Sequence, residues 1–389
     1  MRNIVFLGLI SFFMDIGSEM VYPIIPLYLT AAFGATPALV GIIEGIAEST
    51  AGLLKVFSGY ITDKYNKKKP IAFAGYATGF LYKLALIFAS SWPGILTARV
   101  IDRLGKGIRT APRDVMVSEN ADKTSMGKSF GIHKALDMAG SAIGILLAFF
   151  MLGNLGGDIK NYKLIFIVSA IPTVLALVMF VFVKENKEPR KIESKEYFWK
   201  NISKLDTRLK LYLIITFIFT LGNSSNTFLL LQAKNAGFND TNVILLYFIY
   251  NITVALLSVP MGKLSDTVGR KIILLVGYVL FSVVYLGFGM ADKQWMFVVL
   301  FIIYGVFTAM TSGVERALIA EISPENLKGT MLGLHSTIVG IALLPASVIC
   351  GFLWDNFGSF VPFAFGAGMS AVAALLLALF FGTTVKKKR

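Results

Sequence analysis

Long apolar stretches constrain this chain more than any other feature of its sequence. Apolar residues make up 56% of the 389 residues, and charged residues make up only 15%, compared with about 25% in ordinary soluble domains. Several stretches exceed the roughly 20 residues with which an α-helix crosses a bilayer. The sequence therefore predicts an all-α membrane protein whose chain crosses the bilayer many times.

The hydropathy pattern predicts twelve transmembrane helices in two pseudo-symmetric bundles of six. We expect the first bundle in residues 1–183, a polar cytoplasmic linker in 184–209, and the second bundle, with a basic tail, in 210–389. The expected helices cover residues 4–32, 37–61, 70–90, 93–118, 127–152, 162–183, 210–233, 241–262, 270–290, 295–320, 328–354 and 358–382.

Basic residues gather on alternate loops of this pattern. The formal net charge of +14 would suggest a nucleic-acid partner in a soluble protein, but here the lysines and arginines follow the positive-inside rule. One side of the membrane holds Lys64, Lys67, Lys68, Lys69, Lys123, Lys263, Arg270, Lys271, Lys328 and the tail 386–389, and the other side holds only Lys160, Lys163, Lys234 and Lys293. We therefore expect a multi-pass protein of the cell (inner) membrane with both termini in the cytoplasm, and no nucleic-acid partner.

An internal repeat supports the division into two bundles. Gly59 and Asp63 recur as Gly262 and Asp266. The basic pair after Asp63 recurs, at the same distance along the chain, as the pair that begins at Arg270. Parallel repeats of this kind are typical of secondary transporters that rock about a central site.

These motifs resemble those of the major facilitator superfamily, and the resemblance covers essentially the whole chain. The segments 59–68 and 262–271 are similar to the loop motif that this family carries between its second and third spans and repeats in its second half. Ile16-Gly17 followed by Pro23 and Pro26 resembles the signature of the twelve-helix drug:proton antiporters. Arg103-x2-Lys106-Gly107 resembles the Arg-x-x-Gln-Gly motif of the same branch, with Lys in place of Gln.

One feature departs from the antiporter pattern. The Gly-Pro motif of their fifth span has no proline here, where the chain reads Ala139-Gly140-Ser-Ala-Ile-Gly144. Gly140 and Gly144 lie four residues apart, so they would still permit close packing of this helix against a neighbour.

The repeated loop motif implies a gate at the inner ends of the helices. Glycine removes bulk where helices must approach, and the carboxylates of Asp63 and Asp266 can bind a helix N-terminus or a cation from span four. In the family this motif latches the outward-facing state. We assign gating to Gly59, Asp63, Arg109, Arg113, Gly262, Asp266 and Arg270.

A cluster of charges lies within the predicted spans of the first bundle. Ionised side chains at this depth cost roughly 3 kcal/mol each, so they must face a protein interior or a wet cavity. The members come in pairs four residues apart, which places each pair on one helix face. We assign proton coupling to Asp15, Glu19, Glu44, Glu48 and Arg103.

A structural interpretation of the same cluster remains open. In it, Asp102, Glu44 and Glu48 form ion pairs with Arg99, Lys55 or Lys83 that only hold the bundle together. Polar residues that reach the middle of the membrane supply the expected substrate contacts. We assign substrate binding to Arg99, Asp102, Lys106, His133, Asp137, Asn223, Asn226, Tyr250, Asn251 and Thr311.

The sequence thus predicts a secondary active transporter that works by alternating access. The first hypothesis is proton-coupled export of a small amphipathic or cationic compound. An organic anion or phosphorylated metabolite held by Arg99, Arg103, Lys106 and Lys83 is the alternative substrate, and a lipid translocator is a third hypothesis. We expect a monomer in the lipid bilayer whose partners are its small-molecule substrate and protons, with no enzymatic activity, no cofactor and, since the chain has two histidines, no metal site.

Overall fold

The computed structural model describes residues 2–65, 68–120, 126–155, 158–184, 207–322 and 328–380, and every regular element in these ranges is a helix. The α-helices are α1 (Arg2–Val21), α2 (Ile24–Phe33), α3 (Pro37–Tyr65), α4 (Lys68–Phe88), α5 (Trp92–Glu119), α6 (Met126–Leu155), α7 (Ile159–Met179), α9 (Thr207–Gly222), α10 (Thr227–Asn235), α11 (Asp240–Val268), α12 (Arg270–Met290), α13 (Gln294–Ile322), α14 (Lys328–Phe357) and α15 (Phe360–Phe380). A 3-10 turn, Phe180–Phe182, extends α7. Most of the expected linker, the lysines at 67 and 123, and the basic tail lie outside the described residues.

Two of the expected spans are built from two helices each. Span one breaks between α1 and α2 at Pro23, whose ring fixes φ and removes a backbone donor. Span seven breaks between α9 and α10 over residues 223–226, where the sequence has its polar interruption. Counted this way, the described helices form twelve spans, as predicted.

Eleven of these spans are long and apolar enough by composition to cross a membrane. The twelfth is α5, which carries the charged residues between Arg99 and Arg113. It packs between α3 and α4, so neighbouring helices surround its charges.

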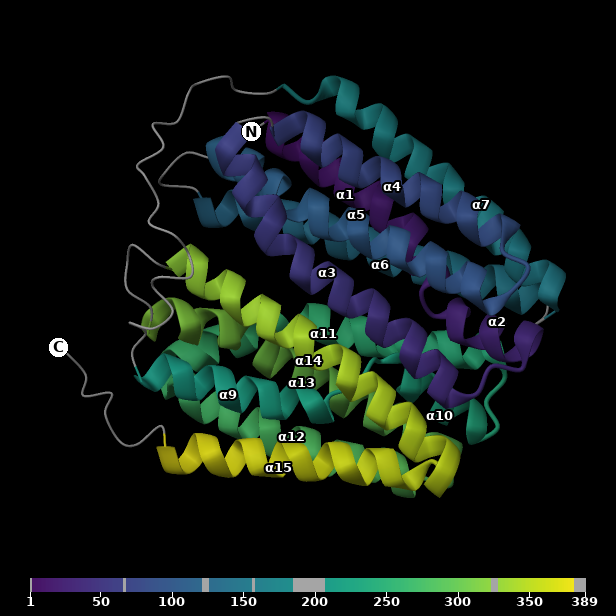
Figure 1. Ribbon diagram of the computed structural model, residues 1–389, viewed down its shortest axis with the longest axis vertical. Helices are drawn as coiled ribbons and strands as arrows, with labels where there is room; N and C mark the ends of the chain where they lie inside the picture. Colours follow the sequence, from purple (N-terminus) through teal and green to yellow (C-terminus); the bar gives the residue numbers. More distant parts are fainter. Residues whose placement is uncertain are drawn as a thin grey trace.

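The helices form two groups that run side by side (Figure 1). Helices α1–α7 make the upper group in this view, and helices α9–α15 make the lower group. We call the end at which α1 begins and α15 ends the terminal end, and the end where α2 and α10 lie the opposite end.

The two groups meet chiefly along α3 and α14, and also along α6 and α11. At mid-depth, a Cβ atom added to Gly52 would lie 2.7 Å from the Cα atom of Gly340, so the two backbones touch. Beside this contact the Ser49 hydroxyl donates a hydrogen bond of 2.6 Å to the Gly340 carbonyl. Only glycine at both positions permits so close an approach of α3 and α14.

Further contacts join the groups at the opposite end. The Tyr162 hydroxyl of α7 donates a hydrogen bond to Asp240 at the start of α11, and Lys234 forms an ion pair with the same carboxylate. The Ala38 amide of α3 donates to Asp355 Oδ2 of α14 at 3.3 Å. The bonds of Tyr162 with Asp240 and of Ala38 with Asp355 hold the opposite ends of the two groups together, whereas the ion pair of Lys234 with Asp240 lies within the second group.

Candidate functional site

A small, highly polar cavity lies inside the first group of helices. Its volume is about 30 Å³, and its walls come from α1 and the turn after it, from α4 and from α5. The lining residues are Asp15, Ser18, Glu19, Tyr22, Tyr82, Arg99, Asp102, Arg103, Lys106 and Arg109.

Helical periodicity explains why α5 lines this cavity. Its five lining residues recur at each helical turn, at 99, then at the neighbours 102 and 103, and then at 106 and 109, so they form one face of the helix. Asp15, Ser18 and Glu19 of α1 and Tyr22 just after it recur in the same way. The charges of both helices therefore point toward one another rather than toward lipid.

Helix α6 brings a further carboxylate to α1. A Cβ atom at Gly140 would lie 2.3 Å from the Phe12 carbonyl oxygen, and one at Gly144 would lie 2.5 Å from that of Ile16. The two glycines thus allow α6 to pack directly on the backbone of α1. This places Asp137, one turn before Gly140, where its carboxyl group interacts with that of Asp15.

The arginines at 99 and 103 have carboxylate partners on α3. Arg99 binds Glu44 through two hydrogen bonds, Nε to Oε1 at 2.9 Å and Nη2 to Oε2 at 2.5 Å. Arg103 Nη2 lies 2.8 Å from Glu48 Oε1. Asp102 lies between the two arginines, with its Oδ2 atom 3.9 Å from Arg99 Nη1 and 3.8 Å from Arg103 Nε. For Glu44 and Glu48 this geometry matches the structural interpretation of the cluster.

Glu19 makes a different set of contacts. It accepts a hydrogen bond of 3.4 Å from the Tyr247 hydroxyl, which belongs to α11 in the other group of helices. It also interacts electrostatically with Lys106 and Arg103. Lys83, which is fully buried, donates instead to the Gly17 carbonyl at 2.7 Å.

Tyr22 is a wall residue that the sequence analysis missed. Its ring lies 5.5 Å from that of Tyr247, and the guanidinium carbons of Arg99 and Arg103 lie 5.4 and 6.0 Å from its centre. The signal was its position three residues after Glu19, which continues the polar face of α1. Tyr22 and Tyr247 together close the cavity toward the second group.

Not all of the expected substrate contacts reach this cavity. His133 Nε2 lies 3.0 Å from Ser11 Oγ, which also contacts the Tyr76 hydroxyl, so this histidine belongs to a network among α1, α4 and α6. Asn251 and Thr311 donate to carbonyl groups of their own helices, at Tyr247 and Phe307.

The remaining expected contacts lie in the second group, beside its aromatic core. Asn226 accepts a hydrogen bond of 2.8 Å from the Tyr304 hydroxyl. The Tyr250 ring lies 5.2 Å from that of Tyr304 and 5.8 Å from that of Tyr247. Asn223 donates through its backbone at the break between α9 and α10.

Two of the expected gate residues lie along α5. Arg109 lines the cavity, with its guanidinium carbon 4.8 Å from the Tyr76 ring centre. Arg113 pairs with its neighbour Asp114 at 2.9 Å. At Gly262, a Cβ atom would meet no atom of the described residues within 4 Å.

The rest of the gate is described only in part. Gly59, Asp63 and Asp266 lie in α3 and α11, and their side-chain environments are outside the described part of the structure. Arg270 begins α12 at the terminal end.

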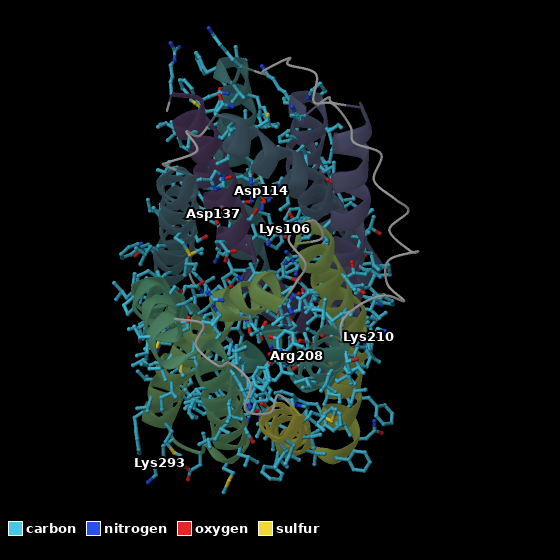
Figure 2. All side chains as sticks on the ribbon, turned by 90° about the vertical axis from the view of Figure 1, so that its left-hand side faces the viewer. Lys106, Asp114, Asp137, Arg208, Lys210 and Lys293 are labelled. Atoms are coloured by element: carbon cyan, nitrogen blue, oxygen red, sulfur yellow. The ribbon has the colours of Figure 1, made fainter. Side chains whose placement is uncertain are left out.

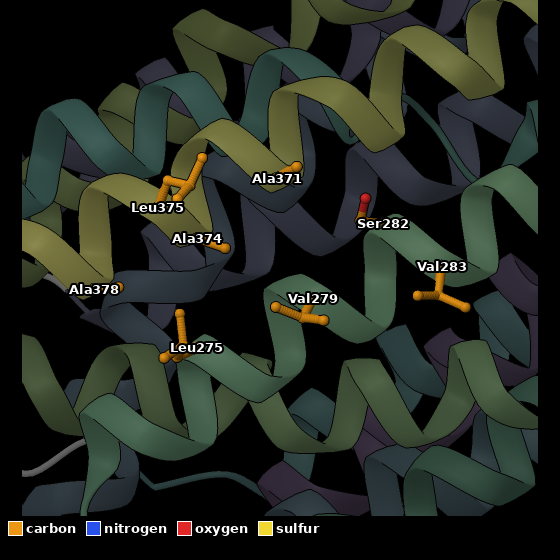
Figure 3. Close-up of a pocket in the computed structure, with 8 residues that line it drawn as sticks. All are labelled: Leu275, Val279, Ser282, Val283, Ala371, Ala374, Leu375 and Ala378. Atoms are coloured by element: carbon orange, nitrogen blue, oxygen red, sulfur yellow. The ribbon is translucent and has the colours of Figure 1, made fainter.

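A larger cavity of about 310 Å³ lies between α12 and α15 (Figure 3). Its lining includes Val279, Val283 and Leu375, which are 50%, 62% and 61% exposed. Among its residues only Ser282 is polar. Such a surface suits contact with lipid, so the charged cavity is the better candidate for the functional site.

Comparisons with known proteins agree with this architecture. The Major Facilitator Superfamily model matches residues 7–231 and 212–389. An uncharacterized MFS-type transporter of Methanocaldococcus jannaschii is 37% identical over 382 residues, which cover 97% of this chain and 94% of that protein. A multi-drug resistance efflux pump PmrA homolog of Lactococcus lactis subsp. lactis is 23% identical, covering 83% of this chain and 81% of its own.

Solved transporters share the fold at low sequence identity. A D-xylose-proton symporter superposes with a TM-score of 0.80 at 16% identity and covers 97% of this chain and 96% of its own. The nucleoside transporter NupG superposes with a TM-score of 0.78 at 12% identity, and the match covers 98% of this chain and 100% of NupG. The family match over nearly the whole length and the archaeal relative show that this chain belongs to the Major Facilitator Superfamily of membrane transporters.

Proposed function

We propose that this transporter exports a small amphipathic or cationic compound in exchange for protons, by alternating access between the two groups of helices. The interaction of Asp15 with Asp137 beside Glu19 carries this proposal. Carboxyl groups gathered in a protein interior exchange protons readily with an arriving cation, because the two cations compete for the same negative charge. The multidrug efflux relative supports export.

Asp15 and Glu19 are the proposed proton carriers. Glu44 is occupied by Arg99, and Glu48 by Arg103, so neither is included. Glu19 also touches Tyr247 across the interface between the groups. A proton on Glu19 changes this contact and so links its charge to the relative position of α1 and α11.

The proposal includes an orientation. The terminal end faces the cytoplasm, with residues 184–209 as a connector between bundles 1–183 and 210–389, and the protein works as a monomer in the cell membrane. The basic residues at this end support that placement. Asp63 and Asp266 serve as inner gates in this arrangement.

Proton exchange can be tested in proteoliposomes that contain a pH-sensitive dye. Adding lipophilic cationic drugs should drive proton movement with the wild-type protein, and Asp15→Asn and Glu19→Gln should each abolish it. Asp292→Asn, which removes an exposed acid in the loop between α12 and α13, is the matched control and should keep the flux. Undiminished drug-driven proton movement in both cavity variants would refute the proposal.

A further inference from the structure

Two buried guanidinium groups of the cavity have nitrogen atoms without a hydrogen-bond partner among the described residues. Arg109 is 5% exposed and its Nη1 is unpartnered, and Arg103 is 5% exposed with Nε unpartnered. Both residues line the cavity. A buried donor without an acceptor is unfavourable, so an oxyanion that accepts hydrogen bonds from these two atoms would be stabilised.

Lys106 adds a third donor at the same place. It lines the cavity one turn before Arg109, its side chain is exposed, and it forms no hydrogen bond or ion pair within the described part of the chain. Figure 2, seen from the terminal end, shows it inside the first group of helices.

The other cations are already engaged. Glu44 neutralises Arg99, the Gly17 carbonyl holds Lys83, and Asp114 pairs with Arg113. Arg103 also gives its Nη2 to Glu48. Arg103 Nε faces Asp102 Oδ2 at 3.8 Å, which is too far for a hydrogen bond. Among the described residues, the donors left for a ligand are therefore those of Arg109 and Lys106, with Nε of Arg103 shared with Asp102.

The size of the cavity limits the ligand group. A volume of about 30 Å³ holds more than the roughly 10–15 Å³ that one water molecule requires. It accommodates a small group such as a carboxylate, but not a whole drug-sized molecule. The remainder of any bound compound must extend beyond the cavity.

We propose that Arg109 and Lys106, assisted by Arg103 Nε, bind an oxyanion group of the transported compound. Guanidinium groups suit this task because their planar donors match carboxylate and phosphate oxygens. Asp15 and Glu19 line the same cavity and offer acceptors to a cationic group of the same molecule. The preferred substrates are thus amphiphiles that carry a carboxylate or phosphate in addition to a basic group. This inference rests on the proposed function in one respect, that the compound is bound in this cavity.

The subsite can be tested by thermal unfolding of the purified full-length protein with matched probes and no proton gradient. The probes are 4-(aminomethyl)benzoate, its methyl ester, benzoate, decanoate and inorganic phosphate. A ligand of the native state raises the apparent melting temperature by mass action. We expect 4-(aminomethyl)benzoate to stabilise the wild-type protein and its methyl ester to have no effect.

Variants then separate a binding role from a structural one. Lys106→Gln removes a side chain that makes no hydrogen bond or ion pair within the described part of the chain. It should weaken binding of the carboxylate probe at least tenfold without changing the melting temperature of the unliganded protein. Arg109→Gln should weaken binding of this probe at least as much, and Arg109→Lys should retain part of the affinity that Arg109→Gln loses. Lys293→Gln is the control, since Lys293 is exposed and lies far from Lys106 in Figure 2.

Three outcomes overturn the proposal. They are equal stabilisation by the methyl ester, no stabilisation by any of the carboxylates, and unchanged affinity in both Lys106→Gln and Arg109→Gln. Stabilisation by phosphate alone would indicate an inorganic co-ion and overturn the assignment to the substrate. The binding test uses no proton gradient, so its result does not depend on proton exchange. If binding depends on Arg109 but the protein shows no proton exchange, the proposed function is refuted and this subsite stands.

Discussion

Arg99 of α5 and Glu44 of α3 face each other through two parallel hydrogen bonds, and the side chains are 2% and 1% exposed. The pair joins two helices deep inside the first group. Removing one partner of such a buried pair leaves an uncompensated charge in a medium that solvates it poorly.

Glu44→Gln should therefore lower the free energy of unfolding by about 3–5 kcal/mol, measured by denaturant unfolding in detergent. Glu48→Gln is the matched comparison. The Glu48 side chain is 27% exposed, so water can replace part of its interaction with Arg103 and the loss should be smaller. Equal losses in the two variants would contradict the difference in burial.

Gly52→Ala should separate α3 from α14. The new methyl group would lie 2.7 Å from the Gly340 Cα atom, so the backbones must shift, at a typical cost of about 1–3 kcal/mol. Unfolding in detergent and transport in vesicles should both report the loss. Gly313→Ala in α13 adds the same methyl group where no atom lies within 4 Å, and it should leave both measurements near wild type.

Asp240→Asn should loosen the opposite end. It weakens the bond from Tyr162, which joins the two groups, and the ion pair with Lys234 inside the second group. A hydrogen bond to a charged group contributes about 1.5–3 kcal/mol. Loss of one such bond shifts the equilibrium between the closed and open states of the opposite end by roughly tenfold or more.

A cysteine at Thr241 can report this opening. Thr241 Cγ2 lies 3.4 Å from the position of a Cβ atom at Gly153 of α6, so its access to a thiol reagent rises when α6 and α11 part. Thr241→Cys is made in a Cys350→Ser background, which removes the chain's single cysteine. Labelling that stays at the parent rate after Asp240→Asn would show that these bonds do not hold the end closed.

Tyr247→Phe should weaken coupling more than stability. It removes the donor to Glu19 but keeps the ring beside Tyr22, so the free energy of unfolding should fall by only about 0.5–1.5 kcal/mol. Drug-driven proton flux should fall several-fold, because Glu19 loses its contact with the other group.

Tyr28→Phe provides the control for that variant. The Tyr28 ring packs against aromatic neighbours, and its hydroxyl forms no hydrogen bond with the described residues. Its proton flux should remain at the wild-type level. An equal fall in both variants would mean that the hydroxyl of Tyr247 has no special role.

The fold was predictable because its signals are local. Apolar length determines the spans, and the polar residues at 223–226 coincide with the break in the seventh. The break at Pro23 was not predicted, although Pro23 had been noticed as part of a motif. The apolar residues on both sides of Pro23 favour one continuous span, and this pattern hides the helix break that the proline ring causes.

The site was predictable within each helix but not between helices. The spacing of Arg99, Asp102 and Arg103 showed that they share a face, yet the choice of Glu44 for Arg99, rather than for Lys55 or Lys83, depends on how far α3 is displaced along α5. Backbone contacts set that displacement, and a single sequence does not contain it.

The charges of α5 also affect how the protein enters its membrane. Each ionised residue near the centre of an isolated helix opposes insertion by about 2.5–3.5 kcal/mol, and α5 has at least four of them on one face. Glu44 and Glu48 arrive first, because α3 precedes α5 along the chain. Pairing with α3 neutralises Arg99 and Arg103, so we expect α5 to enter the lipid more readily beside α3 than alone.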